Sequence, residues 1–98
     1  MSVRKARQAD VCGVLALEGA WETTPHWKRN QFESELGVTS SIFLVAERDG
    51  RLAGFAIARR YPPNLEVLDI AVAVPRQGVG RQLIEALKRE AAGCSTLT

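Results

Sequence analysis

The clearest pattern of apolar and polar positions lies in the last third of the chain. From Glu66 onward it predicts a buried strand, whose apolar residues are Val67, Leu68, Ile70, Val72 and Val74. A turn through Pro75 to Gly80 follows the strand. Apolar residues at helical spacing then predict a helix from about Gly80 to Ala92, with Gly93 as its stop signal. The apolar residues of this helix are Leu83, Ile84 and Leu87.

A short strand and two helices are predicted in the first part of the chain. Ser2 to Ala6 is interpreted as the strand. Asp10 stands where an acidic residue starts a helix, and that helix is expected to end near Gly19. Thr24-Pro25 resembles an N-cap followed by proline at the first helical position, so a second helix should open there and end at Gly37.

Two further strands are predicted at residues 41–46 and 52–58, joined by Asp49-Gly50, which is a strong hairpin signal. With the strand that starts near Glu66 they would form an antiparallel meander. Tyr61 to Asn64 is the turn that leads into this third strand. Ser95 to Thr98 has room only to start another strand, parallel to the central one. The expected fold class is α+β.

Composition and charge exclude several classes of protein. With 98 residues, 46% of them hydrophobic and 24% charged, the chain is expected to form one folded domain and not a disordered segment. A net charge of +2 without a run of Lys and Arg argues against nucleic-acid binding. The sequence has no apolar run long enough for a membrane span and no signal peptide, so a cytoplasmic location is expected. Cys12 and Cys94 are isolated, which predicts neither a metal site nor a structural disulfide.

The glycine turn has the features of an anion site. Gly78 and Gly80 let backbone N–H groups converge, and the following helix adds unpaired N–H groups and the positive end of its dipole. Arg76 and Arg81 flank the turn and add positive charge, which favours a diphosphate. The alternative is a tight strand-to-helix turn that needs glycines for geometry alone. A dinucleotide-binding fingerprint requires a small residue at the position of Leu83, so the sequence does not match that fingerprint.

The tryptophans of the first loop allow two interpretations. Trp21 and Trp27 bracket His26, and the three side chains would line a substrate-facing rim in one of them. In the other, the tryptophans close the core over the helix pair and His26 lies on the surface.

The segment after the meander resembles the acetyl-coenzyme A motif of the GNAT N-acetyltransferases, most of all the branch that acetylates the N-terminal alanine of a ribosomal protein. The residues that carry the resemblance are Ile70, Ala71 and Val72, then Arg76, Gln77, Gly78, Val79, Gly80 and Arg81, then Leu83 and Ile84. Upstream, the Asp49-Gly50 hairpin, Leu17-Glu18 and the stretch from Ala53 to Ile57 also fall where that family has its first helices and strands.

The resemblance implies a cosubstrate and a reaction. Acetyl-CoA would place its pyrophosphate on the turn from Arg76 to Arg81 and its pantetheine arm along the strand from Ile70 to Val72. The acetyl group would go to a primary amine, either a protein N-terminus or a small amine. Pro75 departs from the family pattern, which has a polar residue at that position.

The resemblance also suggests a general base. Some members of the family carry a glutamate on the central strand at the position of Glu66, where a carboxylate would take a proton from the amine. The alternative is a solvent-facing strand residue. Asp69, expected on the opposite face of the strand, is a second candidate. Tyr61 is the only tyrosine and is expected to belong to the turn.

Relatives continue with further strands that this chain, ending at Thr98, does not contain. We therefore expect residues 1–98 to form a partial GNAT-like domain that lacks the C-terminal strands, including the base and acid of the ribosomal branch. An open strand edge would favour a homodimer or a complementing chain. The alternative function is a non-catalytic module for coenzyme binding or assembly.

Overall fold

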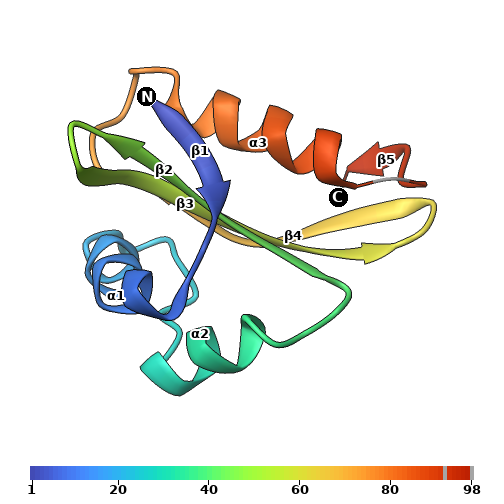
Figure 1. Cartoon of the computed structure of the whole chain (residues 1–98), viewed down its shortest axis with the longest axis horizontal. Helices are drawn as coiled ribbons and strands as arrows, with labels where there is room; N and C mark the ends of the chain where they lie inside the picture. The colour runs from blue at the N-terminus through green and yellow to red at the C-terminus, as the bar shows by residue number, and fades with distance from the viewer. Residues whose placement is uncertain (92, 98) are drawn as a thin grey trace.

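A five-stranded sheet with helices on both faces forms the framework (Figure 1). The computed structural model describes residues 1–91 and 93–97. The strands are β1 (Ser2–Lys5), β2 (Ser41–Arg48), β3 (Arg51–Tyr61), β4 (Asn64–Val72) and β5 (Thr96–Leu97). They lie in the order β1-β2-β3-β4-β5. The first four are antiparallel, and β5 runs parallel to β4. The expected α+β fold and its meander are confirmed.

The helices are η1 (Gln8–Asp10), α1 (Val11–Gly19), α2 (Arg29–Glu35) and α3 (Val79–Glu90). In Figure 1, α3 covers one face of the sheet, and α1 and α2 cover the other. The core is accordingly divided into two clusters, one on each face. The sheet therefore separates the helix that follows the glycine turn from the two helices of the N-terminal part.

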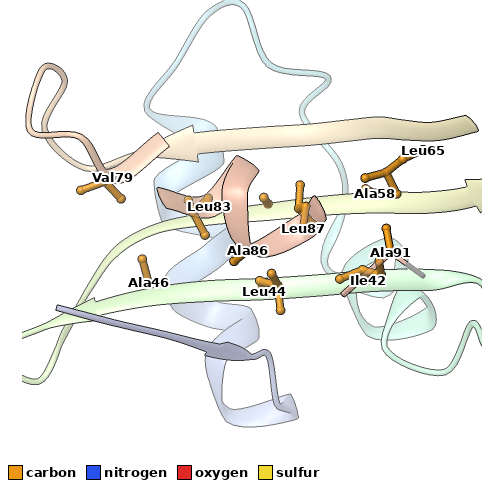
Figure 2. Packing of buried hydrophobic residues seen from close by; sticks show 11 residues of the cluster. Ile42, Leu44, Ala46, Ala58, Leu65, Val79, Leu83, Ala86, Leu87 and Ala91 are labelled. Atoms are coloured by element: carbon orange, nitrogen blue, oxygen red, sulfur yellow. The ribbon is translucent and has the colours of Figure 1, made fainter. Parts of the chain in front are cut away.

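Helix α3 is amphipathic, and its apolar stripe packs on β2, β3 and β4. Figure 2 shows Leu83 and Leu87 of α3 among the side chains that the strands contribute to this cluster. Both side chains are fully buried. The rest of this cluster consists of Ile42, Leu44, Ala46, Ala56, Ala58, Leu65, Val79, Ala86 and Ala91. Small residues on the strands let the helix approach the sheet closely.

Aromatic rings fill the other face. Phe32 of α2 lies with its ring centroid 5.8 Å from that of Phe55 on β3, in an edge-to-face arrangement. Trp27 packs on Phe32 from the loop, with centroids 5.3 Å apart. Val11 and Val14 of α1 complete the buried layer. The interpretation that the loop closes the core is thus correct for Trp27.

The hairpin between β2 and β3 turns at Asp49 and Gly50, as predicted. Both residues have positive φ, 53° and 75°. That combination belongs to the turn whose twist matches the two flanking strands, and Asp-Gly is one of the few pairs that adopt it readily.

Strand β4 contains a β-bulge that was not predicted from the sequence. Val67 pairs with Ala58 and Asp69 pairs with Ile57, so Leu68 has no partner of its own on β3. Cross-strand partners share a face of the sheet. The bulge therefore puts Asp69 on the face covered by α1 and α2.

The expectation that Asp69 and Glu66 lie on opposite faces is wrong for this reason. Glu66 pairs with Arg59, whose guanidinium reaches Glu35 of α2, so Glu66 also faces α1 and α2. In a regular strand two residues three positions apart would point in opposite directions, and the extra residue cancels that alternation.

Helix α2 begins at Arg29 and not at Pro25. The Thr24 hydroxyl donates backward to the carbonyls of Glu18 and Trp21, at 2.8 and 3.0 Å, and so does not cap a following helix. His26 then has a positive φ of 57°, which no helix accommodates. Lys28 is the N-cap that the structure uses.

The predicted ends of the central unit need smaller corrections. Strand β4 ends at Val72, and Val74, expected in the buried strand, is 51% exposed in the turn. The last ladder bond is from the Ala73 amide to the Ala53 carbonyl, after which the chain leaves the sheet. Helix α3 starts at Val79 and ends at Glu90. The predicted end at Ala92 and the last residue of the predicted strand, Thr98, lie outside the described residues.

The packing of α3 on the sheet predicts how a substitution in the helix changes the stability of the fold. Leu87→Ala should lower the free energy of unfolding by about 2–5 kcal/mol, because it removes a fully buried side chain and leaves a cavity. Urea denaturation followed by circular dichroism measures the change. Leu97→Ala is the matched control, since Leu97 is 40% exposed. Equal loss of stability in the two variants would contradict this account of the core.

Candidate functional site

The glycine turn presents free backbone amides at the start of α3. Gly78 is the N-cap of this 12-residue helix and has φ 78° and ψ 5°, a left-handed conformation that suits glycine. The first bond of the helix runs from the Gln82 amide to the Gly78 carbonyl, at 3.1 Å. Within residues 1–91 and 93–97, the amides from Gly78 to Arg81 donate to no protein acceptor. These N–H groups are thus available to an anion.

One side chain at the turn is buried, and the others are exposed. Val79 is only 3% exposed and belongs to the core under α3, so its side chain faces the protein. Arg76, Gln77 and Arg81 are exposed. Nε of Arg81 lies 3.5 Å from Oε1 of Glu85, one helical turn further on. An exposed pair of this kind is weak and leaves the guanidinium available to a ligand.

Arg48, which the sequence did not single out, reaches the turn from the end of β2. Its Nη1 donates to Oε1 of Gln77 at 2.7 Å. The hairpin thereby holds one side of the turn and adds a third positive charge beside Arg76 and Arg81. No local pattern could have identified it, because the two residues are far apart in the sequence.

Two adjoining hollows follow β4 away from the turn. The first is largely apolar and is lined by Trp21, Thr23, Thr24, Ile70, Ala71, Val72 and Gly80. The second continues along the strand and is lined by Thr23, Thr24, Pro25, Val67, Leu68, Asp69 and Ile70. The shared residues are Thr23, Thr24 and Ile70. The strand residues of the predicted coenzyme site are thus brought together with Gly80, along one continuous surface.

Trp21 forms part of the wall of this surface. Its indole Nε1 donates to the carbonyl of Val72 at 2.9 Å, which ties the loop to the end of β4. The side chain is half-buried and also packs on the core, as the second interpretation expects. That it faces a substrate stays a prediction. His26 is exposed, and its Nε2 lies 2.8 Å from the Trp21 carbonyl.

A buried pair of carboxyl groups lies beneath the second hollow. Glu18 of α1 is 1% exposed and Asp69 of β4 is 4% exposed. Burial, together with the hydrogen bond and charge of the neighbouring Glu18 carboxyl, raises the pKa of Asp69 to about 8. The backbone amide of Ile70 acts in the opposite direction and lowers the pKa of Asp69. Glu18 accepts a hydrogen bond from the Trp27 amide at 3.0 Å. Both oxygens of Asp69 are buried and make no hydrogen bond of good geometry to the described residues, so a direct link between the two carboxyls needs a proton on one of them.

The sequence contained one signal for this pair. Glu18 stands seven positions after Val11 and four after Val14, which places an acid on the apolar face of α1. An acid in such a position is unusual and needs a partner. Its partner could not be found in the same way, because Asp69 reaches that face only through the bulge.

Glu66, the predicted general base, lies on the surface. It is exposed near the start of β4 and is not among the residues that line the two hollows. Arg59, its cross-strand partner, donates to both oxygens of Glu35, at 2.8 and 3.0 Å. The catalytic role of Glu66 stays a prediction. Tyr61, expected in the turn, is the last residue of β3 and pairs with Asn64 of β4, so only Pro62 and Pro63 form the turn; its side chain is 49% exposed.

Other kinds of site are poorly represented in the described part of the chain. No group of three His, Cys, Asp or Glu side chains there could hold a metal ion. Cys12 is exposed and Cys94 half-buried, and both are free thiols. None of the helices in residues 1–91 and 93–97 has the length and hydrophobicity needed to span a membrane.

Comparison with protein families decides the family. The model of the acetyltransferase (GNAT) family matches residues 9–97. The chain belongs to this family. The resemblance to this family that was inferred from the sequence is confirmed.

Solved structures of GNAT enzymes have the same fold. The ribosomal-protein-S18-alanine N-acetyltransferase from Escherichia coli is 25% identical, with a TM-score of 0.77 over 91% of this chain and 57% of that enzyme. A ribosomal-protein-alanine N-acetyltransferase from Brucella melitensis is also 25% identical, with a TM-score of 0.72 over 92% of this chain and 66% of that one. An aminoglycoside N-acetyltransferase in complex with CoA is 21% identical, with a TM-score of 0.81 over 99% of this chain and 76% of that one.

The chain spans less than two thirds of the length of the two ribosomal-protein enzymes, 57% and 66%. The comparison with curated proteins gives no match. The family therefore rests on the family model, and the solved structures show the fold.

The buried acid pair predicts an unusual dependence of stability on pH. Folded Asp69 keeps its proton up to about pH 8, whereas an unfolded aspartate loses it near pH 4. The folded state thus binds more protons between these values, and the free energy of unfolding should fall as pH rises from about 4 to about 8. Asp69→Asn should reduce this fall and be more stable than the wild type near pH 9, as measured by urea denaturation. Glu66→Gln, which removes an exposed carboxyl from the same strand, should retain the wild-type slope; an Asp69→Asn slope equal to wild type would contradict the burial argument.

Proposed function

We propose that this chain binds acetyl-CoA and transfers the acetyl group to a primary amine. The observation that carries the proposal is the set of unpaired amides from Gly78 to Arg81, which opens onto the hollow along β4. An anion at the turn and an extended, mostly apolar arm along the strand together match a coenzyme with a diphosphate at one end and a thioester at the other. Membership of the GNAT family supports this choice of ligand.

The residues present fit that ligand. The turn offers its amides to the diphosphate, and Arg76, Arg81 and Arg48 supply charge around it. Gln77 is held by Arg48, and Val79 fixes the turn through its buried side chain. The hollow beside Ile70, Ala71 and Val72 would take the pantetheine arm. The coenzyme would supply an activated acetyl thioester, and a neighbouring aminoglycoside N-acetyltransferase has been solved with CoA.

The acceptor is proposed as a primary amine because the structural neighbours are named for such acceptors. Two are ribosomal-protein-alanine N-acetyltransferases, and one is an aminoglycoside N-acetyltransferase. The second hollow, between β4 and Thr23 to Pro25, lies where an acceptor would meet the end of the arm. Glu66 is the general base that the family resemblance implies. A cytoplasmic location also remains a prediction from the sequence.

A non-catalytic assembly module is the alternative, and the edge of β4 is the observation that favours it. Within the described residues, β5 pairs with β4 at Asn64 and Leu65. From Glu66 to Val72 no described strand pairs with β4 on that side. An edge of this kind is a template for a strand from a second copy or from a complementing chain.

Ligand binding tests the diphosphate site. Arg81→Glu should weaken CoA binding about tenfold, or about 1.4 kcal/mol, because it reverses a charge beside the turn. Its affinity for pantetheine, which lacks the diphosphate, should not change. Isothermal titration calorimetry measures both. Arg89→Glu is the matched control, since it makes the same change of net charge in the last turn of α3. Absence of CoA binding by the wild type would overturn the proposal.

Turnover and assembly separate the two functions. If the chain is an enzyme, acetyl-CoA should be consumed in the presence of primary amines, and Glu66→Gln should reduce the rate by about 100-fold if that carboxylate is the base. CoA binding without consumption, together with a dimer in light scattering, is the result expected for the assembly module. A monomer without turnover would contradict both.

A further inference from the structure

Glu18 of α1 and Asp69 of β4 lie against each other inside the protein, and we call them the acid pair. Their side chains are 1% and 4% exposed. Both oxygens of Asp69 are buried and make no hydrogen bond of good geometry to the described residues. A buried carboxyl usually has a cation or a full set of hydrogen bonds. The pair is therefore compatible with the folded state only while a proton keeps one carboxyl neutral.

Glu18 also fixes the loop of residues 20–28, which follows α1. Its Oε2 accepts a hydrogen bond from the Trp27 amide at 3.0 Å. Its backbone carbonyl accepts from the Trp21 amide at 3.2 Å and from the Thr24 hydroxyl at 2.8 Å. The first and last parts of the loop are thus bound to one residue, and a displacement of Glu18 moves the loop.

The same loop forms one wall of the two hollows along β4. Trp21, Thr23 and Thr24 line the hollow that reaches Gly80. Thr23 and Thr24 also line the second hollow, whose opposite wall is the part of β4 that contains Asp69. The acid pair therefore connects the two walls, because Glu18 holds the loop and Asp69 belongs to the strand.

No cation neutralises the acid pair among the described residues. Helix α3 and its cations lie on the opposite face of the sheet (Figure 1). The other charged groups of the packed elements are bound to partners of their own: Arg59 to Glu35, Asp10 to Arg4, and Glu33 to Gln8. The charged side chains of the loop, of α2 and of β4 that remain are exposed: Glu22, His26, Lys28, Arg29 and Glu66.

We propose that the acid pair is a pH-dependent latch that holds the loop of residues 20–28 against β4. A proton shared between the two carboxyls links the walls, and the hollows keep their shape. When that proton leaves, two buried carboxylates repel each other, and Glu18 moves away from the strand together with the loop. For its effect on acetyl-CoA this inference rests on the proposed function, whereas the movement of the loop does not.

The latch should open just above neutral pH. Burial and the neighbouring Glu18 carboxyl raise the pKa of Asp69 to about 8. Because the folded-state pKa lies above the ordinary value of an aspartate, the link is present below that pKa and is lost as the pH rises through it. The loop should consequently be closed at about pH 6 and open in most molecules at about pH 9.

Tryptophan fluorescence tests the latch without a coenzyme. Trp21 and Trp27 are the two tryptophans of the chain, and both are half-buried residues of the loop. Quenching by acrylamide, which is uncharged, should increase about twofold between pH 6 and pH 9, because opening exposes the indoles. Far-UV circular dichroism should stay constant over this range. Constant quenching, or a change in circular dichroism with the same midpoint, would overturn the inference.

Two variants locate the effect. Asp69→Asn places a neutral donor beside Glu18 at every pH, so quenching should stay at the low wild-type value up to pH 9. Glu22→Gln removes an exposed acid from the same loop and should retain the wild-type increase. An increase in Asp69→Asn, or its loss in Glu22→Gln, would contradict the latch. If Asp69→Asn does not fold, Glu18→Gln leaves the same pair with a single carboxyl and should show the same constant quenching.

Coenzyme affinity separates this inference from the proposed function. One linked proton with a pKa of about 8 should weaken CoA binding by the wild type about tenfold by pH 9. Asp69→Asn should bind CoA equally well at pH 7 and pH 9, as measured by isothermal titration calorimetry. A wild-type protein that binds no CoA refutes the proposed function and leaves the quenching result to decide the latch. Wild-type affinity that is the same at both pH values refutes the latch alone.

Discussion

The burial of Val79 is the contact on which the candidate site depends. This side chain is 3% exposed and packs with the apolar stripe of α3 on the sheet. Because the first residue of the helix is fixed in the core, the turn before it cannot rotate, and the amides from Gly78 to Arg81 stay directed outward. The free energy that holds these amides in place is thus the hydrophobic energy of α3 itself. A helix with a weaker stripe would leave the same glycines without a defined geometry.

The bulge at Leu68 determines which residues lie at the other end of the two hollows along β4. One extra residue turns Asp69 toward α1 and gives it a buried glutamate as neighbour. Without the bulge the carboxyl would face α3 and its apolar layer. An irregular strand, β4, and two buried acids, Glu18 and Asp69, therefore occur at the same place in the structure. Local departures from regular geometry of this kind are more often found at functional sites than elsewhere.

Much of the framework followed from the sequence because its signals are local. Asp49-Gly50 specified the hairpin, and the spacing of Leu83 and Leu87 specified α3. The turn from Arg76 to Arg81 was recognised because its glycines and arginines are adjacent in the chain. The start of α2 was missed because Thr24 has two ways to use its hydroxyl, and the sequence does not say which one it takes. Arg48 and the partnership of Glu18 with Asp69 depend on contacts between distant residues, which no pattern in a single sequence reveals.

The hydrogen bond from Arg48 to Gln77 has a consequence for the order of events during folding. These residues are separated by 29 positions, and the guanidinium reaches the turn only from the end of a completed hairpin. Closing so long a loop costs entropy, which must be recovered from contacts formed afterwards. The hairpin should consequently assemble first, and the turn should become rigid only when α3 docks. A nascent chain would thus acquire its strands before the amides of the turn take up a defined geometry.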